Sequence, residues 1–125
     1  MTLHSSSRRD SKADLLPGTL DMLILRTLQW GEQHGYAIAQ TIRAQSSEVL
    51  QVEAGSLYPA LQRLAKKGWV TAKWAQTDAN QRAKFYKLTP DGKKQLVREA
   101  SRWAELVNAI SQVMKPGLTP GVSDE

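Results

Sequence analysis

The spacing of apolar residues changes twice in the second half of the chain, and this limits the folds it can adopt. Leu57, Leu61 and Leu64 recur at the interval of an α-helix. From residue 69 to residue 89 the interval shortens to two, the repeat of a β-strand. From residue 90 onward it lengthens again to steps of three and four. The chain therefore predicts a helix, then a β-hairpin, then a long helix.

The helix that opens this series has clear end signals. Ser56 is a good N-cap residue and Gly68 a good stop. Pro59 then falls in the first turn, where its missing N–H has no intrahelical partner to lose. The buried stripe is predicted to consist of Leu57, Leu61, Leu64 and Ala65. The opposite face carries residues that a core does not need, namely Tyr58, Pro59, Gln62, Arg63 and Lys66.

The hairpin and the start of the long helix follow from local composition. Segments 69–75 and 83–89 are rich in aromatic and β-branched residues and flank a polar loop around residues 77–80. Thr89 is then a suitable N-cap, with Pro90 at the first helical position. Asp91 lies near the positive end of the helix dipole. We expect this helix to run to about residue 114.

The long helix carries apolar residues in alternating steps of four and three, which is the a/d pattern of a coiled coil. These residues are Leu96, Ala100, Trp103, Val107, Ile110 and Met114. A small domain does not need to bury so long a seam, so we expect a homodimer through this helix. A two-fold dimer would present two copies of each exposed surface, related by the dyad.

The first half of the chain predicts two more helices. Apolar residues between Pro17 and Gly31 lie on more than one side of the first helix, which should therefore lie centrally. Residues 34–45 predict the second helix, and residues 49–52 predict a brief strand. The inward stripe of the second helix is predicted to be Tyr36, Ala39 and Ile42, with Ile38 to one side.

Positive charge is confined to one segment of the chain. The formal net charge is +5, and residues 54–98 contain ten Lys or Arg but only two Asp or Glu. This segment includes both the helix with the polar face and the hairpin. Such a distribution is typical of a protein that binds a polyanion. An ordinary solvated basic surface is the alternative.

Three short helices followed by a hairpin are typical of the winged helix-turn-helix, a mainly α (α+β) fold with a two-stranded β-wing. Here a long C-terminal dimerisation helix would follow. In this fold the third helix enters the DNA major groove and the wing flanks it. The predicted DNA-binding residues are Ser56, Tyr58, Pro59, Gln62, Arg63, Lys66, Arg82 and Lys84. Gln62 can pair with an adenine edge, and Arg63 with guanine or a phosphate. Tyr58 packing back on the hairpin is the alternative.

The chain is predicted to have four parts: a disordered arm at 1–14, a DNA-binding domain at 15–89, a dimerisation helix at 90–115 and a flexible tail at 116–125.

The chain has no apolar run near the ~18 residues of a membrane helix. The arm lacks the hydrophobic region of a signal peptide. We therefore expect a cytoplasmic protein. No cysteine and no paired His/Glu spacing are present, so neither a metal nor a cofactor is predicted.

Several motifs resemble the PadR family of bacterial transcriptional regulators. They are Gly18–Leu25, His34–Tyr36, Gly55–Leu61 with Arg63, Leu64 and Gly68, and Lys84–Thr89 with Gly92. Together they span roughly residues 16–114. The resemblance implies a dimeric winged-helix repressor with a single dimerisation helix that responds to an effector or another signal. It also implies that Tyr58 and Pro59 begin the recognition helix and that Lys84–Thr89 is the second strand of the wing.

Two features qualify this resemblance. The family often carries consecutive arginines before the second wing strand, whereas residues 80–84 read NQRAK, so contact of the wing with phosphate or the minor groove should be weaker. Some members of the family bind planar compounds between their dimerisation helices. Trp103 would suit such a planar small-molecule effector, with one copy from each chain across the dyad. Filling the dimer core is the alternative role of Trp103.

Catalysis and protein–protein interaction are the two alternatives to DNA binding. Catalysis is disfavoured because the chain has only two histidines, His4 and His34, and no recognisable acid, base or nucleophile set. A winged helix used as a protein-interaction module without specific DNA binding stays open, because fold alone does not fix function. The concentrated basic charge favours nucleic acid. We therefore expect a repressor, not an enzyme, that binds a palindromic double-stranded DNA operator as a homodimer.

Overall fold

The computed structural model describes residues 18–115, which form four helices and a three-stranded antiparallel sheet. The elements in chain order are α2 (Thr19–Leu28), β1 (Gln33–His34), α3 (Gly35–Gln45), α4 (Ala54–Lys66), β2 (Val70–Gln76), β3 (Arg82–Leu88) and α5 (Pro90–Met114). The predicted arm at 1–14 and tail at 116–125 lie outside the described residues. The architecture is the predicted winged helix with a long final helix.

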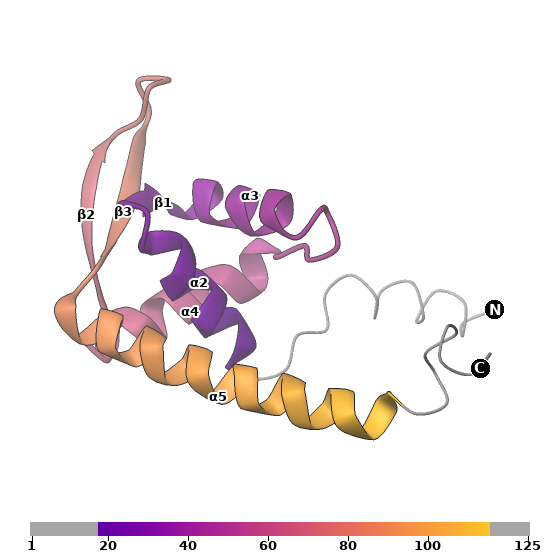
Figure 1. The fold of residues 1–125 in the computed structure, drawn as a ribbon. Helices are drawn as coiled ribbons and strands as arrows, with labels where there is room; N and C mark the ends of the chain where they lie inside the picture. The colour runs from indigo at the N-terminus through magenta and orange to yellow at the C-terminus, as the bar shows by residue number, and fades with distance from the viewer. Residues whose placement is uncertain (1–17, 116–125) are drawn as a thin grey trace.

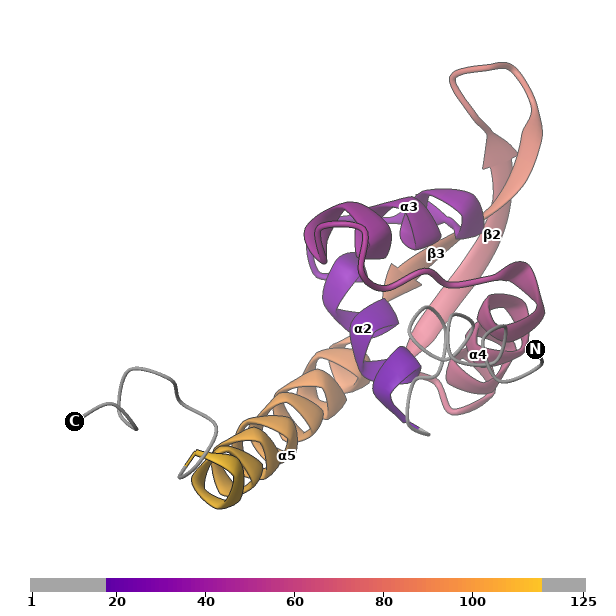
Figure 2. The same cartoon turned by 90° about the vertical axis from the view of Figure 1, so that its right-hand side faces the viewer.

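The helix α2 lies at the centre of the fold, as predicted, and contacts α3, α4, α5 and β3 (Figure 1). The hairpin of β2 and β3 projects beyond the helices at one end of the molecule. On the opposite side α5 runs past the N-terminal end of α2, and the view in Figure 2 shows it leaving the rest of the fold. The wing and the second half of α5 are therefore the two parts that extend furthest from the core.

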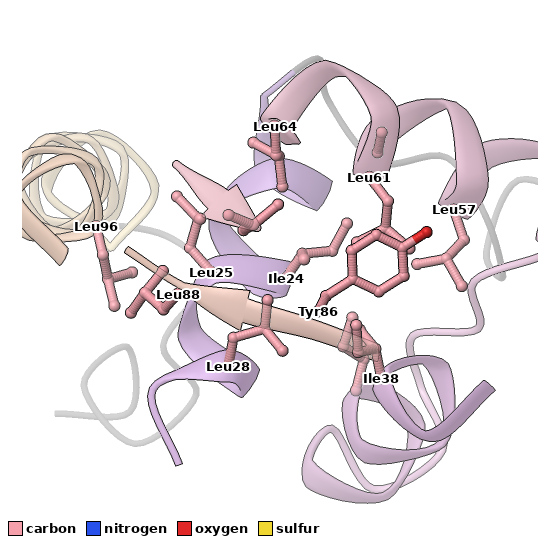
Figure 3. Close-up of a cluster of buried hydrophobic side chains, with 13 residues drawn as sticks. Ile24, Leu25, Leu28, Ile38, Leu57, Leu61, Leu64, Tyr86, Leu88 and Leu96 are labelled. Atoms are coloured by element: carbon pink, nitrogen blue, oxygen red, sulfur yellow. The ribbon is translucent and has the colours of Figure 1, made fainter. Parts of the chain in front are cut away.

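One hydrophobic core forms where the helices meet the sheet. Its members are Ile24, Leu25, Leu28, Ile38, Ile42, Leu57, Ala60, Leu61, Leu64, Val70, Tyr86, Leu88 and Leu96. Figure 3 shows Tyr86 pointing from β3 toward Leu57 and Leu61 of α4. This packing holds one face of α4 against the base of the wing and leaves its other face to solvent.

The start of α4 differs from the prediction. Glu53, and not Ser56, is the N-cap, with an extended backbone (φ −92°, ψ 156°) and no side-chain cap. The Glu53 carbonyl accepts the N–H groups of Ser56 and Leu57 at 3.0 and 2.9 Å. Pro59 therefore lies in the second turn, not the first, and the N–H that it lacks would have bonded to the Gly55 carbonyl. Small residues at 54 and 55 give no capping signal, so the early start could not be predicted.

Two stripe assignments were also wrong. On α4, Ala60 completes the buried stripe with the three leucines, while Ala65 is exposed. On α3, Ile38 is fully buried and Tyr36 is 66% exposed. Ile38 and Ile42 are four residues apart and share the buried face of α3, whereas Tyr36 lies about 200° around the helix from Ile38 and therefore points outward.

The third strand of the sheet was not predicted. Residues 49–52 form no strand, and Gln33 and His34 pair instead with Tyr86 and Phe85 of β3. The predicted hairpin is confirmed: β2 and β3 pair from Val70–Leu88 out to Gln76–Arg82. A two-residue strand has too short a pattern to be found in the sequence, whereas two seven-residue strands repeat their alternation several times.

The junction between the wing and α5 follows the prediction. Thr89 is the N-cap of α5, and its hydroxyl oxygen accepts the Gly92 N–H at 3.0 Å. The same hydroxyl donates to the Gly68 carbonyl at 2.7 Å. Gly68 ends α4 with a left-handed φ of 79°. A residue with a β-carbon would adopt this backbone conformation only with steric strain. The end of α4 and the start of α5 are thereby tied together.

Candidate nucleic-acid interface

The outer face of α4, defined as Tyr58, Pro59, Gln62, Arg63 and Lys66, is exposed as predicted. It lies opposite the buried stripe of the same helix. An open depression of about 650 Å³ lies along this face and is lined by Pro59, Gln62, Arg63, Ala65 and Lys66. Ser56 is exposed in the first turn of the helix. One side of α4 is thus committed to the core, and the other is available to a partner.

Arg63 is tied to another helix. Its Nη2 donates to Asp21 Oδ1 of α2 at 2.8 Å. The Asp21 side chain is 15% exposed and that of Arg63 is 52% exposed. Arg63 can therefore contact DNA either while it stays paired with Asp21 or after this ion pair breaks. Lys66, in contrast, makes no ion pair with any described residue, and its charge is available to a phosphate.

Tyr58 packs toward the start of α3, whereas the alternative predicted from the sequence was packing on the hairpin. A β-carbon at Gly35 would lie 2.7 Å from both Cε1 and the hydroxyl oxygen of Tyr58, so the ring occupies the space above that glycine. Burial raises the pKa of Tyr86, and the neighbouring Tyr58 raises it further by a smaller amount. Tyr58 nevertheless stays 44% exposed. It therefore belongs both to the outer face and to the contact between α4 and α3.

The basic residues of the wing gather around one tryptophan. Arg82 Cζ lies 4.7 Å and Lys84 Nζ 5.9 Å from the centroid of a Trp74 ring. Trp74 is 56% exposed, so this cluster lies on the surface of the wing. Trp69 is partly buried and packs against the core. The aromatic ring attracts both cations and restricts where they lie.

A groove of about 770 Å³ separates the wing from α4 and the start of α3, and we call it the wing groove. Its wing side consists of Trp74, Arg82, Ala83, Lys84, Tyr86 and the loop residues Thr77, Asp78, Ala79 and Gln81. Its helical side consists of His34, Gly35, Tyr36, Tyr58 and Gln62. The groove brings together four predicted DNA contacts, Tyr58, Gln62, Arg82 and Lys84. The other four, Ser56, Pro59, Arg63 and Lys66, lie outside it on α4.

Among the residues of the wing groove that were not predicted as site residues are His34, Tyr36 and Trp74. His34 Nδ1 accepts the Ala37 N–H at 3.3 Å as the cap of α3, and its ring packs edge-on against Phe85 at 5.3 Å. The Tyr36 hydroxyl accepts a hydrogen bond from Gln40 Nε2 at 3.1 Å. The one available signal was the spacing of Ile38 and Ile42, because a helix that buries these two residues exposes Tyr36.

Most of the predicted seam on α5 is exposed. Leu96 is 5% exposed and belongs to the core of its own chain, so it has little surface left for a partner. The later seam residues Ala100, Trp103, Val107, Ile110 and Met114 are all exposed. Leu106 and Val113, which were not predicted, widen the seam. We define the α5 stripe as Trp103, Leu106, Val107, Ile110, Val113 and Met114.

Trp103 also borders a small pocket of about 180 Å³ between α5 and the start of α2. The other lining residues are Gly18, Thr19, Met22, Glu99, Arg102 and Leu106. Sites for drug-sized ligands usually enclose about 300–1,000 Å³. A planar effector at Trp103 would therefore need a second chain to complete its site.

Other kinds of site find little support between residues 18 and 115. Within that range no group of His, Asp or Glu side chains is arranged to hold a metal ion. None of the helices there combines the length and the apolar character that crossing a membrane requires. The candidate interface consists of the exposed face of α4 together with the wing.

The family model for "Transcriptional regulator PadR-like family" matches residues 24–98, from the middle of α2 into α5. The chain belongs to the PadR-like family. The match includes the whole of α4 and the wing, which are the elements that form the candidate interface. PadR-like proteins are DNA-binding regulators and not enzymes, so the chain is a DNA-binding transcriptional regulator.

Known proteins similar to this PadR-like chain support the same assignment. An uncharacterized protein of Lysinibacillus sphaericus is 31% identical over 104 residues, covering 83% of this chain and 95% of its own. A transcriptional regulator from Clostridium thermocellum is 28% identical with a TM-score of 0.71, covering 78% of this chain and 91% of that one. A PadR family regulator from Clostridium difficile is 28% identical with a TM-score of 0.67, covering 78% and 99%. The likeness therefore spans nearly the whole length of each relative.

Proposed function

We propose that this PadR-like regulator is a repressor that binds a palindromic operator as a homodimer in the cytoplasm. The observation that carries the proposal is the combination of two exposed surfaces. The outer face of α4 is polar and basic, whereas the α5 stripe is apolar and lies on the part of α5 that leaves the core. The first surface suits DNA and the second suits another copy of the same helix.

The α5 stripe argues for the dimer. The helix has 25 residues, about 37 Å at ~1.5 Å per residue, yet its buried residues are Gly92, Gln95 and Leu96 near its start. Every described residue from 100 onward is exposed. Full burial of one Val, Leu, Ile or Met side chain is worth about 1.5–3 kcal/mol. An exposed stripe at a/d-like spacing gains this energy by pairing with a second helix.

A two-fold dimer makes the operator a palindrome, because each chain presents the same α4 to one half-site. Gln62 and Arg63 are proposed to read base edges, and Lys66 to contact the backbone. Residues 15–89 then act as the DNA-binding domain and residues 90–115 as the dimerisation helix. Bound at a promoter, the dimer blocks the polymerase.

Release from DNA requires a signal that binds two states of the dimer unequally. Trp103 lies on the α5 stripe beside the start of α2, the helix that also holds Arg63 through Asp21. A planar effector between the two Trp103 rings would therefore act close to the elements that position α4. Packing of Trp103 in a ligand-free dimer core uses the same position, and titration with planar compounds separates the two roles.

Binding to the duplex upstream of the protein's own gene tests the function, with a scrambled duplex beside it and salt varied for both. Tight binding that falls steeply with salt and favours the native duplex is expected. Equal weak binding to both duplexes would favour the protein-interaction module instead.

Gln62→Ala is expected to weaken binding to the operator by about 1–3 kcal/mol and to relax preference at one base pair of each half-site. The reason is that Gln62 is exposed in the middle of the outer face, where an amide can pair with an adenine edge. Binding to a panel of operators with single base changes measures this. Lys66→Ala is the comparator and should weaken all operators alike. A uniform loss for Gln62→Ala would show that it contacts the backbone only.

A further inference from the structure

Asp21 brings a negative charge to the edge of the outer face of α4. It lies in the first turn of α2, the central helix, and its side chain is 15% exposed. The other ion pairs between residues 18 and 115 use carboxylates that are 24% to 66% exposed, and none of them includes a residue of that face. An enclosed carboxylate on a central helix has little freedom to follow its partner. Asp21 therefore fixes the position of the Arg63 guanidinium.

The hydrogen bond to Asp21 leaves most of the Arg63 guanidinium unused. A guanidinium has five N–H donors in a planar fork, and Arg63 gives one of them to Asp21 Oδ1. Its side chain donates to no other residue in the described part of the chain. Pairing with O6 and N7 of guanine takes two donors. Arg63 can therefore stay paired with Asp21 and contact a base edge at the same time.

The pair also changes what Arg63 contributes on an arbitrary sequence. A cation that neutralises a phosphate raises affinity for any DNA, whatever its bases. The charge of Arg63 is already opposed by Asp21, and the Asp21 carboxylate repels a phosphate that comes near it. Lys66, one turn further along the same face, is not opposed in this way. A repulsive group that acts against the wrong partner is one of the two routes to specificity.

We propose that Asp21 is a positioning residue that sets the sequence preference of α4. This inference rests on the proposed reading of a base edge by Arg63. On the correct base pair, Arg63 keeps its bond to Asp21 and adds hydrogen bonds to the base. On a wrong base pair the held guanidinium finds no acceptor, and it can reach a phosphate only by leaving Asp21. Because the side chain is held before DNA arrives, less conformational entropy is lost on correct binding.

Docking of α4 on α2 is the purely structural role that the same ion pair could have. The core contacts of Leu57, Leu61 and Leu64 already hold α4 in place. An ion pair whose cation is 52% exposed adds little to stability. A variant without the carboxylate should therefore fold, and its DNA preference separates the two roles. A docking role alone would leave that preference unchanged.

The test uses Asp21→Asn in the full-length protein, with the native upstream duplex and a scrambled duplex over a range of salt concentrations. Binding to the scrambled duplex is expected to become roughly three- to ten-fold tighter, with a slope of log K against log salt that is steeper by about 0.9, because Arg63 is free to neutralise a phosphate. Affinity for the native duplex should not rise. The preference for the native duplex should thus fall by at least the same factor.

Glu99→Gln is the control for the change in net charge. Glu99 is also a partly enclosed carboxylate in an ion pair, but its partner is Arg102 on the same helix, α5. This variant should keep the wild-type preference and the wild-type salt slope. Thermal unfolding checks that each variant is folded. Asp21→Ala removes the same charge with a good helix former and replaces Asp21→Asn if that variant does not fold.

A panel of operators with single base changes shows whether Asp21 acts through Arg63. Arg63→Ala should lose preference at one base pair of each half-site, and Asp21→Asn should relax preference at that base pair and at no other. In a chain that already carries Arg63→Ala, adding Asp21→Asn should leave the preference between duplexes unchanged. A residue that only supports the fold would not produce this localised effect.

The two proposals fail in different ways. A wild type without preference for the native duplex contradicts the proposed function. A wild type that prefers it, with the same preference and salt slope in Asp21→Asn, overturns the role of Asp21 alone. Equal weakening of Asp21→Asn on both duplexes overturns it too, because that result indicates a structural role. So does an Arg63→Ala variant that weakens every operator alike, since Arg63 would then contact only the backbone.

Discussion

Val107→Asp is expected to give a folded chain that is monomeric in solution and has lost most of its affinity for operator DNA. Val107 lies in the middle of the α5 stripe, is 41% exposed in the single chain and has no role in the core. In a dimer it would be enclosed by the partner helix, and an unpaired carboxylate there costs several kcal/mol. Each ~1.4 kcal/mol is tenfold in the dimer dissociation constant. Sedimentation or light scattering over a range of concentrations measures the mass.

Val97→Asp is the matched control for Val107→Asp. Val97 is on the same helix and is 64% exposed, but it lies about 130° around the helix from the middle of the stripe. This variant should keep the mass of the wild type and its operator binding. Val97→Asp should unfold at nearly the wild-type temperature, whereas Val107→Asp should unfold somewhat lower because association no longer stabilises the fold. An unchanged mass for Val107→Asp would show that the α5 stripe is not the dimer interface.

The sequence predicted those parts of the fold whose pattern repeats over several residues or whose whole motif lies within a few neighbouring residues. Thr89, Pro90 and Asp91 form a helix start within three residues, and the structure places the N-cap at Thr89. The alternation of β2 and β3 extends over seven residues in each strand, long enough to be recognised. Apolar spacing likewise found the buried leucines of α4.

The parts that could not be predicted depend on contacts between distant segments. β1 has two residues, and it is a strand only because β3 lies beside it. Arg63 pairs with a carboxylate 42 residues earlier, which no local pattern indicates. The wing groove combines residues of α3, α4 and the wing, so the part played by His34, Tyr36 and Trp74 emerged only from the fold. Sequence reasoning therefore found the face of α4 and two cations of the wing, but not the aromatic side chains beside them.

Gly92 lies at the junction between the DNA-binding unit and α5. Of the glycines in the described residues, it has the least space for an added β-carbon. A β-carbon on Gly92 would lie 2.1 Å from the Trp69 carbonyl oxygen and 2.8 Å from Leu88 Cδ1. The Trp69 carbonyl cannot move aside freely, because it accepts the Thr89 N–H at 3.0 Å. The first turn of α5 can thus approach the base of the wing only where residue 92 has no side chain.

Gly92→Ala is therefore expected to destabilise the protein by about 3 kcal/mol or more, because backbone on both sides of the contact must shift. For a unit of this size that lowers the unfolding temperature by about 12 °C or more. Gly55→Ala is the control: it is also a helical glycine, with nothing within 4 Å of the added β-carbon. Alanine there should leave stability unchanged or raise it by up to ~1 kcal/mol. Thermal and denaturant unfolding of both variants measure the difference, and equal stabilities would contradict the close contact.

Gly92→Ala also bears on function, because the contact fixes the direction in which α5 leaves the DNA-binding unit. In a dimer joined through α5, that direction sets the distance between the two α4 helices. A variant that survives with a shifted α5 should lose more affinity for the native palindrome than for a single half-site. Binding to operators with altered half-site spacing measures this change in preference. If the variant prefers the same spacing as the wild type, the shift at residue 92 does not change the distance between the two α4 helices.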